Sequence, residues 1–249
     1  MSRNFDLLQR DAGIPKPFPP PSSMPEAGKV DSRKQRDRHL LAEDEVMKLV
    51  QRVFILPGSG KAPEVVAFCG VYSGDGCSWV CAHAAEMLAE HGGGSVCIVD
   101  ANLRNPSLHD YFRFENGRGF ADGVKDDGRP MRELARRASG QHLWLITAGT
   151  VGREPNGSLN PARLRARIAE LRSEFDHVLI DTPPVHSYSD AILLGQLADG
   201  IVLVVGSNST RREPARVAKE SFEAAKIPIL GAVLNKRTFP IPEALYRKL

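Results

Sequence analysis

Residues 65–78, VVAFCGVYSGDGCS, join an apolar run to a glycine-rich turn, and an alanine-rich helical pattern follows them. A strand, a glycine loop and a helix in this order are typical of a phosphate-binding loop, because glycines lack a Cβ and let backbone N–H groups surround phosphate oxygens. The helix also directs the positive end of its dipole at the bound anion. The stretch therefore predicts a phosphate site. The alternative is a glycine turn without a ligand, since short motifs produce false positives.

The loop supplies most of the candidate nucleotide-binding residues. They are Ser73, Gly74, Asp75, Gly76, Cys77, Ser78 and the following Trp79. In the pattern G-x-x-x-x-G-K-[ST], the hydroxyl at the position of Ser78 binds Mg²⁺, and the preceding lysine reaches the β- and γ-phosphates. Here that lysine position holds Cys77, and the first glycine position holds Val71. The sequence thus predicts a backbone cradle for phosphate whose own cation is missing.

Two further apolar runs end in aspartate. Residues 95–99 lead into Asp100, and residues 177–180 lead into Asp181. A single aspartate at a strand end is commonly a turn former, but two of them beside a phosphate loop form a candidate metal site. Carboxylates there can hold Mg²⁺ directly or through water, and the metal can neutralise charge on a transferring phosphoryl group.

Apolar runs rich in β-branched residues alternate with helical patterns along the chain. The expected strands cover residues 64–69, 95–100, 142–147, 177–181, 200–205 and 229–235. The expected helices cover residues 77–91, 161–175, 190–197 and 213–225, and an amphipathic helix over residues 40–54 lies outside the sheet. Strands that are apolar throughout are typical of a parallel sheet covered on both faces. We therefore predict an α/β fold with a doubly wound, mostly parallel sheet flanked by helices, whose ligands bind at the carboxyl ends of the strands.

Length and composition suit one such domain with a tail. The 249 residues are 42% hydrophobic and 25% charged, which is enough for a buried core. We expect a proline-rich, basic N-terminal arm over residues 1–39 and the α/β domain over residues 40–249. The formal net charge of +3 does not indicate a nucleic-acid partner.

The sequence also predicts where the protein resides. No apolar run approaches the ~18 residues that span a bilayer, and the N-terminus lacks the apolar core of a signal peptide, so we expect a cytoplasmic protein. The basic cluster RKQRDR at residues 33–38 leaves open a peripheral contact with anionic lipid at the inner face of the cell membrane.

Four segments, taken in order, resemble the bacterial tyrosine kinase family of phosphate-loop ATPases, which is related to the cell-division-site and partitioning ATPases. They are SGDGCS at residues 73–78, DANLRNPSLH at 100–109, IDTPP at 180–184 and GAVLN at 231–235. The resemblance covers about residues 40–235. It implies ATP or ADP with Mg²⁺ as ligands and a non-specific protein-tyrosine kinase activity. It also implies a polysaccharide co-polymerase, a membrane protein that sets chain length, as partner in capsule and exopolysaccharide assembly.

The resemblance assigns roles to single residues. Ser78 and Asp181 would organise Mg²⁺, and Asp100 would lie near the γ-phosphate as metal partner or base. Asn235 would read the adenine. Arg104, within the second segment, would be the candidate for a substitute catalytic cation.

The departures from the family pattern lie at positions that would take part in catalysis. Cys77 replaces the phosphate-binding lysine, Asn102 replaces the second aspartate of D-x-D, and Tyr72 stands where partitioning ATPases carry an extra lysine. Loss of a contact that stabilises the transition state typically costs ~10²-fold or more in rate, whereas backbone N–H groups and Mg²⁺ can still retain a nucleotide. We therefore predict a catalytically impaired pseudokinase. The alternatives are an active tyrosine kinase that uses Arg104 or a partner's arginine, and a partitioning-type ATPase switch that dimerises around ATP.

Three further features concern assembly, the C-terminal segment and the Cys77 thiol. The resemblance implies ring assembly through an E-x-x-R-x-x-R pattern, of which Glu45, Lys48 and Gln51 retain part, so a homo-oligomer is left open. The C-terminal segment carries Tyr246 in place of the family's tyrosine cluster. A Cys77 thiolate at a helix N-terminus would make the nucleotide site redox-sensitive, while packing as a small apolar residue is the alternative.

Overall fold

The computed structural model describes residues 43–56, 60–125, 128–150, 160–207 and 209–236. The expected N-terminal arm over residues 1–39 and Tyr246 lie outside the described residues. Within the described ranges, no helix has the length and apolarity needed to cross a membrane.

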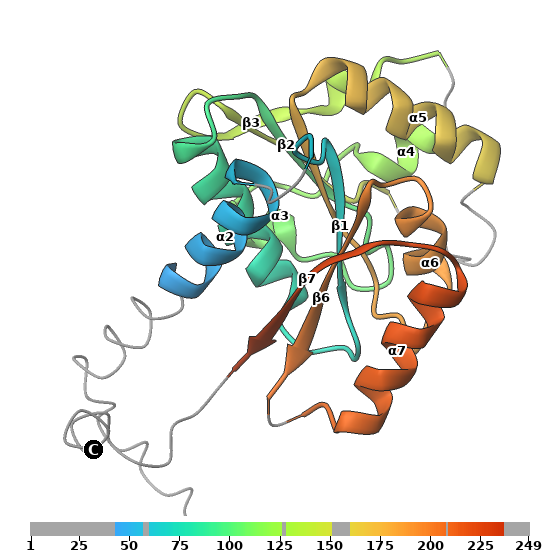
Figure 1. Ribbon diagram of the computed structural model, residues 1–249. Coiled ribbons are helices and arrows are strands. Elements are labelled where there is room, and N and C mark those ends of the chain that lie inside the picture. Colours follow the sequence, from blue (N-terminus) through green and yellow to red (C-terminus); the bar gives the residue numbers. More distant parts are fainter. Residues whose placement is uncertain (1–42, 57–59, 126–127, 151–159, 208, 237–249) are drawn as a thin grey trace, which may run out of the picture. The chain divides into compact units, whose positions relative to one another are not determined.

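A seven-stranded sheet in the order β3-β4-β2-β5-β1-β6-β7 lies at the centre of the described domain (Figure 1). Its strands are β1 (Val65–Gly70), β2 (Val96–Asp100), β3 (Arg136–Ser139), β4 (Leu143–Ile146), β5 (His177–Asp181), β6 (Gly200–Gly206) and β7 (Ile229–Asn235). All neighbouring pairs are parallel except the antiparallel pair of β3 and β4. The predicted α/β, doubly wound and mostly parallel sheet is therefore confirmed.

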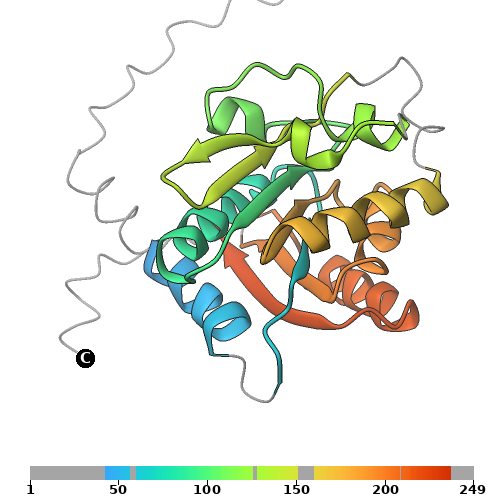
Figure 2. The ribbon, with the colours of Figure 1, turned by 90° about the horizontal axis from the view of Figure 1, so that it is seen from above.

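Helices cover both faces of this sheet (Figures 1 and 2). The longer ones are α2 (Cys77–His91), α5 (Pro161–Glu174) and α7 (Arg212–Ala224). The shorter ones are α3 (Leu108–Tyr111), α4 (Phe120–Lys125), α6 (Asp190–Gly195), the 3₁₀ helix η2 (Met131–Leu134) and the π-helical η1 (Gln51–Ile55), which continues a helix over residues 43–50.

The sheet has hydrophobic packing on both faces, because successive side chains along a strand point to opposite faces. Val66 and Phe68 point to the face covered by α2 and by residues 43–54, while Val65 and Ala67 point to the face covered by α4 to α7. All six residues of β1 are buried because the strand is central and covered on both sides. Of the expected helix over residues 40–54, the described residues 43–54 are helical and pack on the domain through their apolar side chains.

The sequence did not predict β3 or the short helices α3, α4 and η2. β3 reads RRAS and alternates between half-buried and exposed positions, so it lacks the apolar pattern that identifies the central strands. It pairs at the sheet edge with β4, and this pairing depends on the position of the edge rather than on an apolar pattern in β3.

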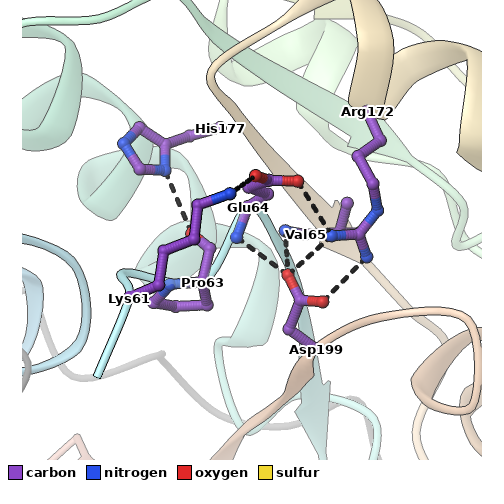
Figure 3. A network of polar contacts seen from close by, with 7 residues as sticks. All are labelled: Lys61, Pro63, Glu64, Val65, Arg172, His177 and Asp199. Atoms are coloured by element: carbon purple, nitrogen blue, oxygen red, sulfur yellow. Dashed lines mark hydrogen bonds and ion pairs between the residues drawn. The ribbon is translucent and has the colours of Figure 1, made fainter. Parts of the chain in front are cut away.

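A polar network holds the start of β1 in place (Figure 3). One oxygen of Asp199 accepts the backbone N–H groups of Glu64 and Val65 at 2.8 and 2.9 Å, and the guanidinium of Arg172 donates to both oxygens of Asp199. Arg172 also donates to Glu64 at 3.1 Å. Although burial acts to raise the pKa of Asp199, the bonds from Arg172 and the two N–H groups hold it below its usual value. The network lies at the amino end of β1, opposite the phosphate loop, and lines a cavity of ≈ 620 Å³.

Candidate nucleotide site

The loop between β1 and α2 depends on two glycines in the left-handed region. Gly74 has a φ of 87°, and Gly76, which directly precedes α2, has a φ of 85°. A Cβ on Gly76 would lie 2.3 Å from the Nδ2 atom of Asn235, whereas a Cβ on Gly74 would meet no atom within 4 Å. Gly76 is therefore favoured both by its backbone angles and by the close approach of the Asn235 side chain to the loop.

The side chain of Asp75 joins the phosphate loop to the segment that follows β6. Its carboxylate is almost fully buried and accepts hydrogen bonds from the backbone N–H of Tyr72 and from the hydroxyls of Ser209 and Thr210, each at 2.9 Å. The carbonyl oxygen of Asp75 accepts a bond from the side chain of Asn235 at 2.9 Å. The side chain of Asp75 thus ties the loop to the segment after β6 and positions the loop.

Ser78 and Asp181 form a polar corner at the start of α2. The Ser78 hydroxyl donates to Oδ2 of Asp181 at 2.6 Å. The other oxygen of Asp181, Oδ1, is buried and has no hydrogen-bond partner among the described residues. A buried carboxylate oxygen without a partner needs water or a cation, and oxygen ligands are those that Mg²⁺ prefers. The two side chains therefore fit a metal ion held at this corner.

Asp100 lies directly beside Asp181 in the register of β2 and β5. Both of its carboxylate oxygens accept backbone N–H groups, from Asn102, Ser107 and Leu108, at 3.0 to 3.2 Å. Asp100 therefore shapes the segment after β2 and places a second negative charge next to Asp181.

The two aspartates perturb each other. Burial raises the pKa of Asp181 to about 8, and the charge of Asp100 adds to this rise. Burial also raises the pKa of Asp100 to about 6, although its backbone hydrogen bonds oppose the change. A divalent cation at this corner would offset the like-charge repulsion and favour the ionised carboxylates.

A cleft of ≈ 400 Å³ opens over the phosphate loop. Arg104 and Asn102 line it from the segment after β2, and Tyr188 lines it beside Arg104. The guanidinium of Arg104 lies 3.4 Å from Asp190 and 4.7 Å from the centroid of the Tyr188 ring. The structure therefore brings the predicted residue Arg104 to the same cleft as residues 73–79.

Asn235 and Trp79 lie at the edges of this arrangement. The amide of Asn235 donates to the loop and its Oδ1 accepts the N–H of Lys236 at 2.8 Å, so the side chain predicted to read adenine here links β7 to the loop. Trp79 lines the cleft and stacks on His83, with 3.8 Å between the ring centroids.

Lys236 is a cleft residue that the sequence analysis did not identify. It follows the last residue of β7 and its ammonium donates to the carbonyl of Gly74 in the phosphate loop. The only sequence signal was its position directly after the GAVLN segment, at the carboxyl end of a predicted strand.

Cys77 occupies the first position of α2, and all four cysteines are free thiols. Burial, together with the charge of Asp181, raises the pKa of the Cys77 thiol well above its ordinary value. This direction does not favour the reactive thiolate considered from the sequence. The half-buried Cys77 side chain packs against the core on the α2 face of the sheet, as the alternative expected.

The glycine loop between β1 and α2 and the order of the strands define the fold of the P-loop ATPases. The sequence profile of the family described as ATPase MipZ matches residues 64–208, which is more than half of the chain. The septum site-determining protein MinD of Pyrococcus horikoshii OT3, solved with Mg-ADP, has the same fold, with a TM-score of 0.60 at 20% identity over 74% of this chain and 76% of that one.

Among P-loop ATPases, the chain is similar in both sequence and fold to bacterial tyrosine kinases. Tyrosine-protein kinase YwqD of Bacillus subtilis (strain 168) is 33% identical over 162 residues, which are 65% of this chain and 68% of YwqD. The kinase domain of VpsO superimposes with a TM-score of 0.73 at 22% identity and covers 83% of this chain and 99% of that one. The chain belongs to the bacterial tyrosine kinase family, and the resemblance of the four sequence segments is confirmed.

Proposed function

We propose that this chain is a nucleotide-binding, catalytically impaired bacterial tyrosine kinase that acts as a regulatory subunit. The observation that supports the proposal is a site that keeps its phosphate loop and candidate metal ligands but lacks the lysine of the loop. The glycine cradle and the corner of Ser78 and Asp181 are intact, while Cys77 stands in place of the lysine. Residues that hold a nucleotide and its metal are thus retained, and the group that stabilises the transition state from within the loop is lost.

Each side chain has a role in this proposal. Backbone N–H groups of the loop and the N-terminus of α2 bind the phosphates of ATP or ADP. Ser78 and Asp181 hold Mg²⁺, with Asp100 beside them, and the metal supplies charge neutralisation at the phosphates. The neutral thiol of Cys77 offers no positive charge, so turnover falls by ~10²-fold or more while binding is largely retained.

An active tyrosine kinase is the second candidate, and one observation favours it. Arg104 and Lys236 line the same cleft as the loop, so cations from outside the loop lie near the expected phosphates. An arginine or lysine that reaches the transferring group would restore part of the lost stabilisation. A partitioning-type ATPase switch remains a third candidate, and ATP-dependent dimerisation of the chain would support it.

Family membership suggests the setting. We place the chain in capsule or exopolysaccharide assembly, in the cytoplasm, with a polysaccharide co-polymerase of the membrane as partner. Residues 1–39 would form a separate arm and residues 40–249 the nucleotide domain, and the basic cluster at residues 33–38 would allow contact with the inner face of the membrane.

The test compares the native chain with Cys77→Lys and Cys77→Met. Cys77→Met lengthens the side chain without adding charge and is the matched control. Each protein is titrated with a fluorescent ATP analogue and Mg²⁺, and phosphotyrosine formation is measured on the same samples. The proposal expects the native chain to bind without turnover, and it expects Cys77→Lys alone to gain phosphotyrosine. Tyrosine phosphorylation by the native chain would establish the active kinase instead, and a lack of nucleotide binding by all three proteins would refute both.

A further inference from the structure

Lys236 places an ammonium group over the phosphate loop from a distant part of the chain. Its Nζ donates to the carbonyl of Gly74, although the two residues are 162 positions apart. The stem of the lysine passes close to the loop, since a Cβ built on Gly76 would lie 3.7 Å from its Cε atom. Gly76 directly precedes Cys77, so this stem runs beside the residue before the vacated lysine position.

The backbone of Lys236 is held in this place by several contacts. Its carbonyl accepts a bond from the hydroxyl of Ser207 at 2.8 Å, and its N–H donates to the side chain of Asn235 at 2.8 Å. The same asparagine donates to the carbonyl of Asp75 in the loop. Lys236 also adopts a φ of 57°, which is uncommon for a residue with a Cβ and is maintained here by these bonds.

We propose that Lys236 supplies the positive charge that Cys77 lacks and binds the β- and γ-phosphates of the nucleotide. The inference rests on the nucleotide-binding part of the proposed function, because it requires the cleft to bind a nucleotide. A charge that binds the phosphates equally in the ground state and the transition state raises affinity and leaves turnover impaired. A lysine ammonium is a compact charge with three donors on a flexible four-carbon stem, so its bond to a neutral carbonyl can be exchanged for bonds to phosphate oxygens. The site then prefers nucleoside di- and triphosphates to monophosphates.

Arg104 is less suited to this role in the structure. Its guanidinium lies beside the carboxylate of Asp190 and over the ring of Tyr188, so its charge is already partly compensated. Lys236 contacts a carbonyl, which carries no net charge. Between Arg104 and Lys236, it is also Lys236 that lies against the loop itself.

The experiment measures binding of ATP, ADP and AMP to the full chain in the presence of Mg²⁺, by displacement of a fluorescent ATP analogue. Lys236→Gln keeps most of the stem and removes the charge. Lys226→Gln is the matched control, because Lys226 is exposed, lies just after α7 and has the same φ of 57°. We expect Lys236→Gln to weaken ATP and ADP by about 10- to 100-fold, the usual range for a lost bond between charged groups, and AMP far less. The control should bind all three as the native chain does.

Two further variants separate a phosphate contact from a structural effect. Lys236→Arg keeps the charge and should retain most of the preference for ATP over AMP. In a Cys77→Lys background, Lys236→Gln should weaken ATP less than in the native background, because the loop then carries its own cation. A merely structural role of Lys236 would give equal losses in both backgrounds and for all three nucleotides.

The outcomes distinguish the inference from the proposed function. If the native chain binds ATP and Lys236→Gln binds it equally well, the inference is wrong while the proposed function stands. If the native chain binds no nucleotide, both are wrong.

Should Lys236→Gln fail to fold, the native chain is treated instead with an ATP analogue that carries a reactive acyl phosphate. This analogue acylates amines near the terminal phosphate of the bound nucleotide. Mapping by mass spectrometry should place the label on Lys236 and excess ATP should suppress it, and a label confined to other lysines would overturn the inference.

Discussion

Replacement of Asp181 by asparagine should make the stability of the nucleotide-free protein less dependent on pH, so that the variant gains stability relative to the native protein as the pH rises. The carboxylate of Asp181 is fully buried, its Oδ1 has no partner among the described residues, and Asp100 lies beside it. Burial and the neighbouring charge raise its pKa to about 8. Ionising this group in the folded protein is therefore unfavourable unless a cation is bound.

The sign and size of the effect follow from linkage between proton binding and folding. In the unfolded chain an aspartate has a pKa near ~3.9, so between about pH 4 and pH 8 the folded protein holds a proton that the unfolded chain has released. The free energy of unfolding then falls as the pH rises, by up to about 1.4 kcal/mol for each pH unit. The asparagine side chain of the variant does not titrate. From pH 5 to pH 7 the stability of Asp181→Asn relative to the native protein should thus increase by roughly 2–3 kcal/mol.

Urea unfolding of the native protein and Asp181→Asn at pH 5, 6, 7 and 8, without Mg²⁺, tests this prediction. Asp44→Asn is the control, because Asp44 is exposed on the N-terminal helix. Added Mg²⁺ should stabilise the native protein more as the pH rises and should leave Asp181→Asn almost unchanged. A difference between variant and native protein that is independent of pH, or that shrinks as the pH rises, would refute the reasoning.

Three further outcomes are expected. Gly76→Ala should lower MgATP affinity by at least ~10-fold and should reduce thermal stability more than Gly74→Ala does. Both glycines have a positive φ, but only a Cβ at Gly76 would clash with the side chain of Asn235, so equal effects of the two substitutions would contradict this reasoning. Arg172→Met should cost about 1–3 kcal/mol in urea unfolding, because it removes the bonds that Arg172 donates to Glu64 and to Asp199, the side chain that holds the start of β1. Arg216→Met, at an exposed ion pair, should cost under about 0.5 kcal/mol. The four cysteines, whose thiol pKa values are raised by burial, should react slowly with iodoacetamide at pH 8 until the protein is unfolded, and mass spectrometry would reveal any that reacts at once.

The sheet and the phosphate loop could be predicted because their signals are local. β5 and β7 begin and end where the apolar runs predicted, and β1 is shifted by one residue, since a buried parallel strand must be apolar throughout. β3 could not be predicted, because its RRAS sequence is polar and its pairing with β4 is decided by the sheet edge. The loop was predicted from its glycines, whose backbone angles other residues adopt only at a cost.

The sequence alone determined the fold class, the cradle and the missing lysine at Cys77, because each depends on residue type within a short segment. Only the tertiary structure decided which side chains from distant parts of the chain lie next to the phosphate loop and next to each other. The register of β2 and β5 sets Asp100 beside Asp181, one of whose oxygens is buried without a hydrogen-bond partner among the described residues. The parallel pairing of β7 with β6 brings Lys236 to Gly74. Strand register and crossover order bring together groups that lie far apart along the chain, and no local pattern encodes which of them meet.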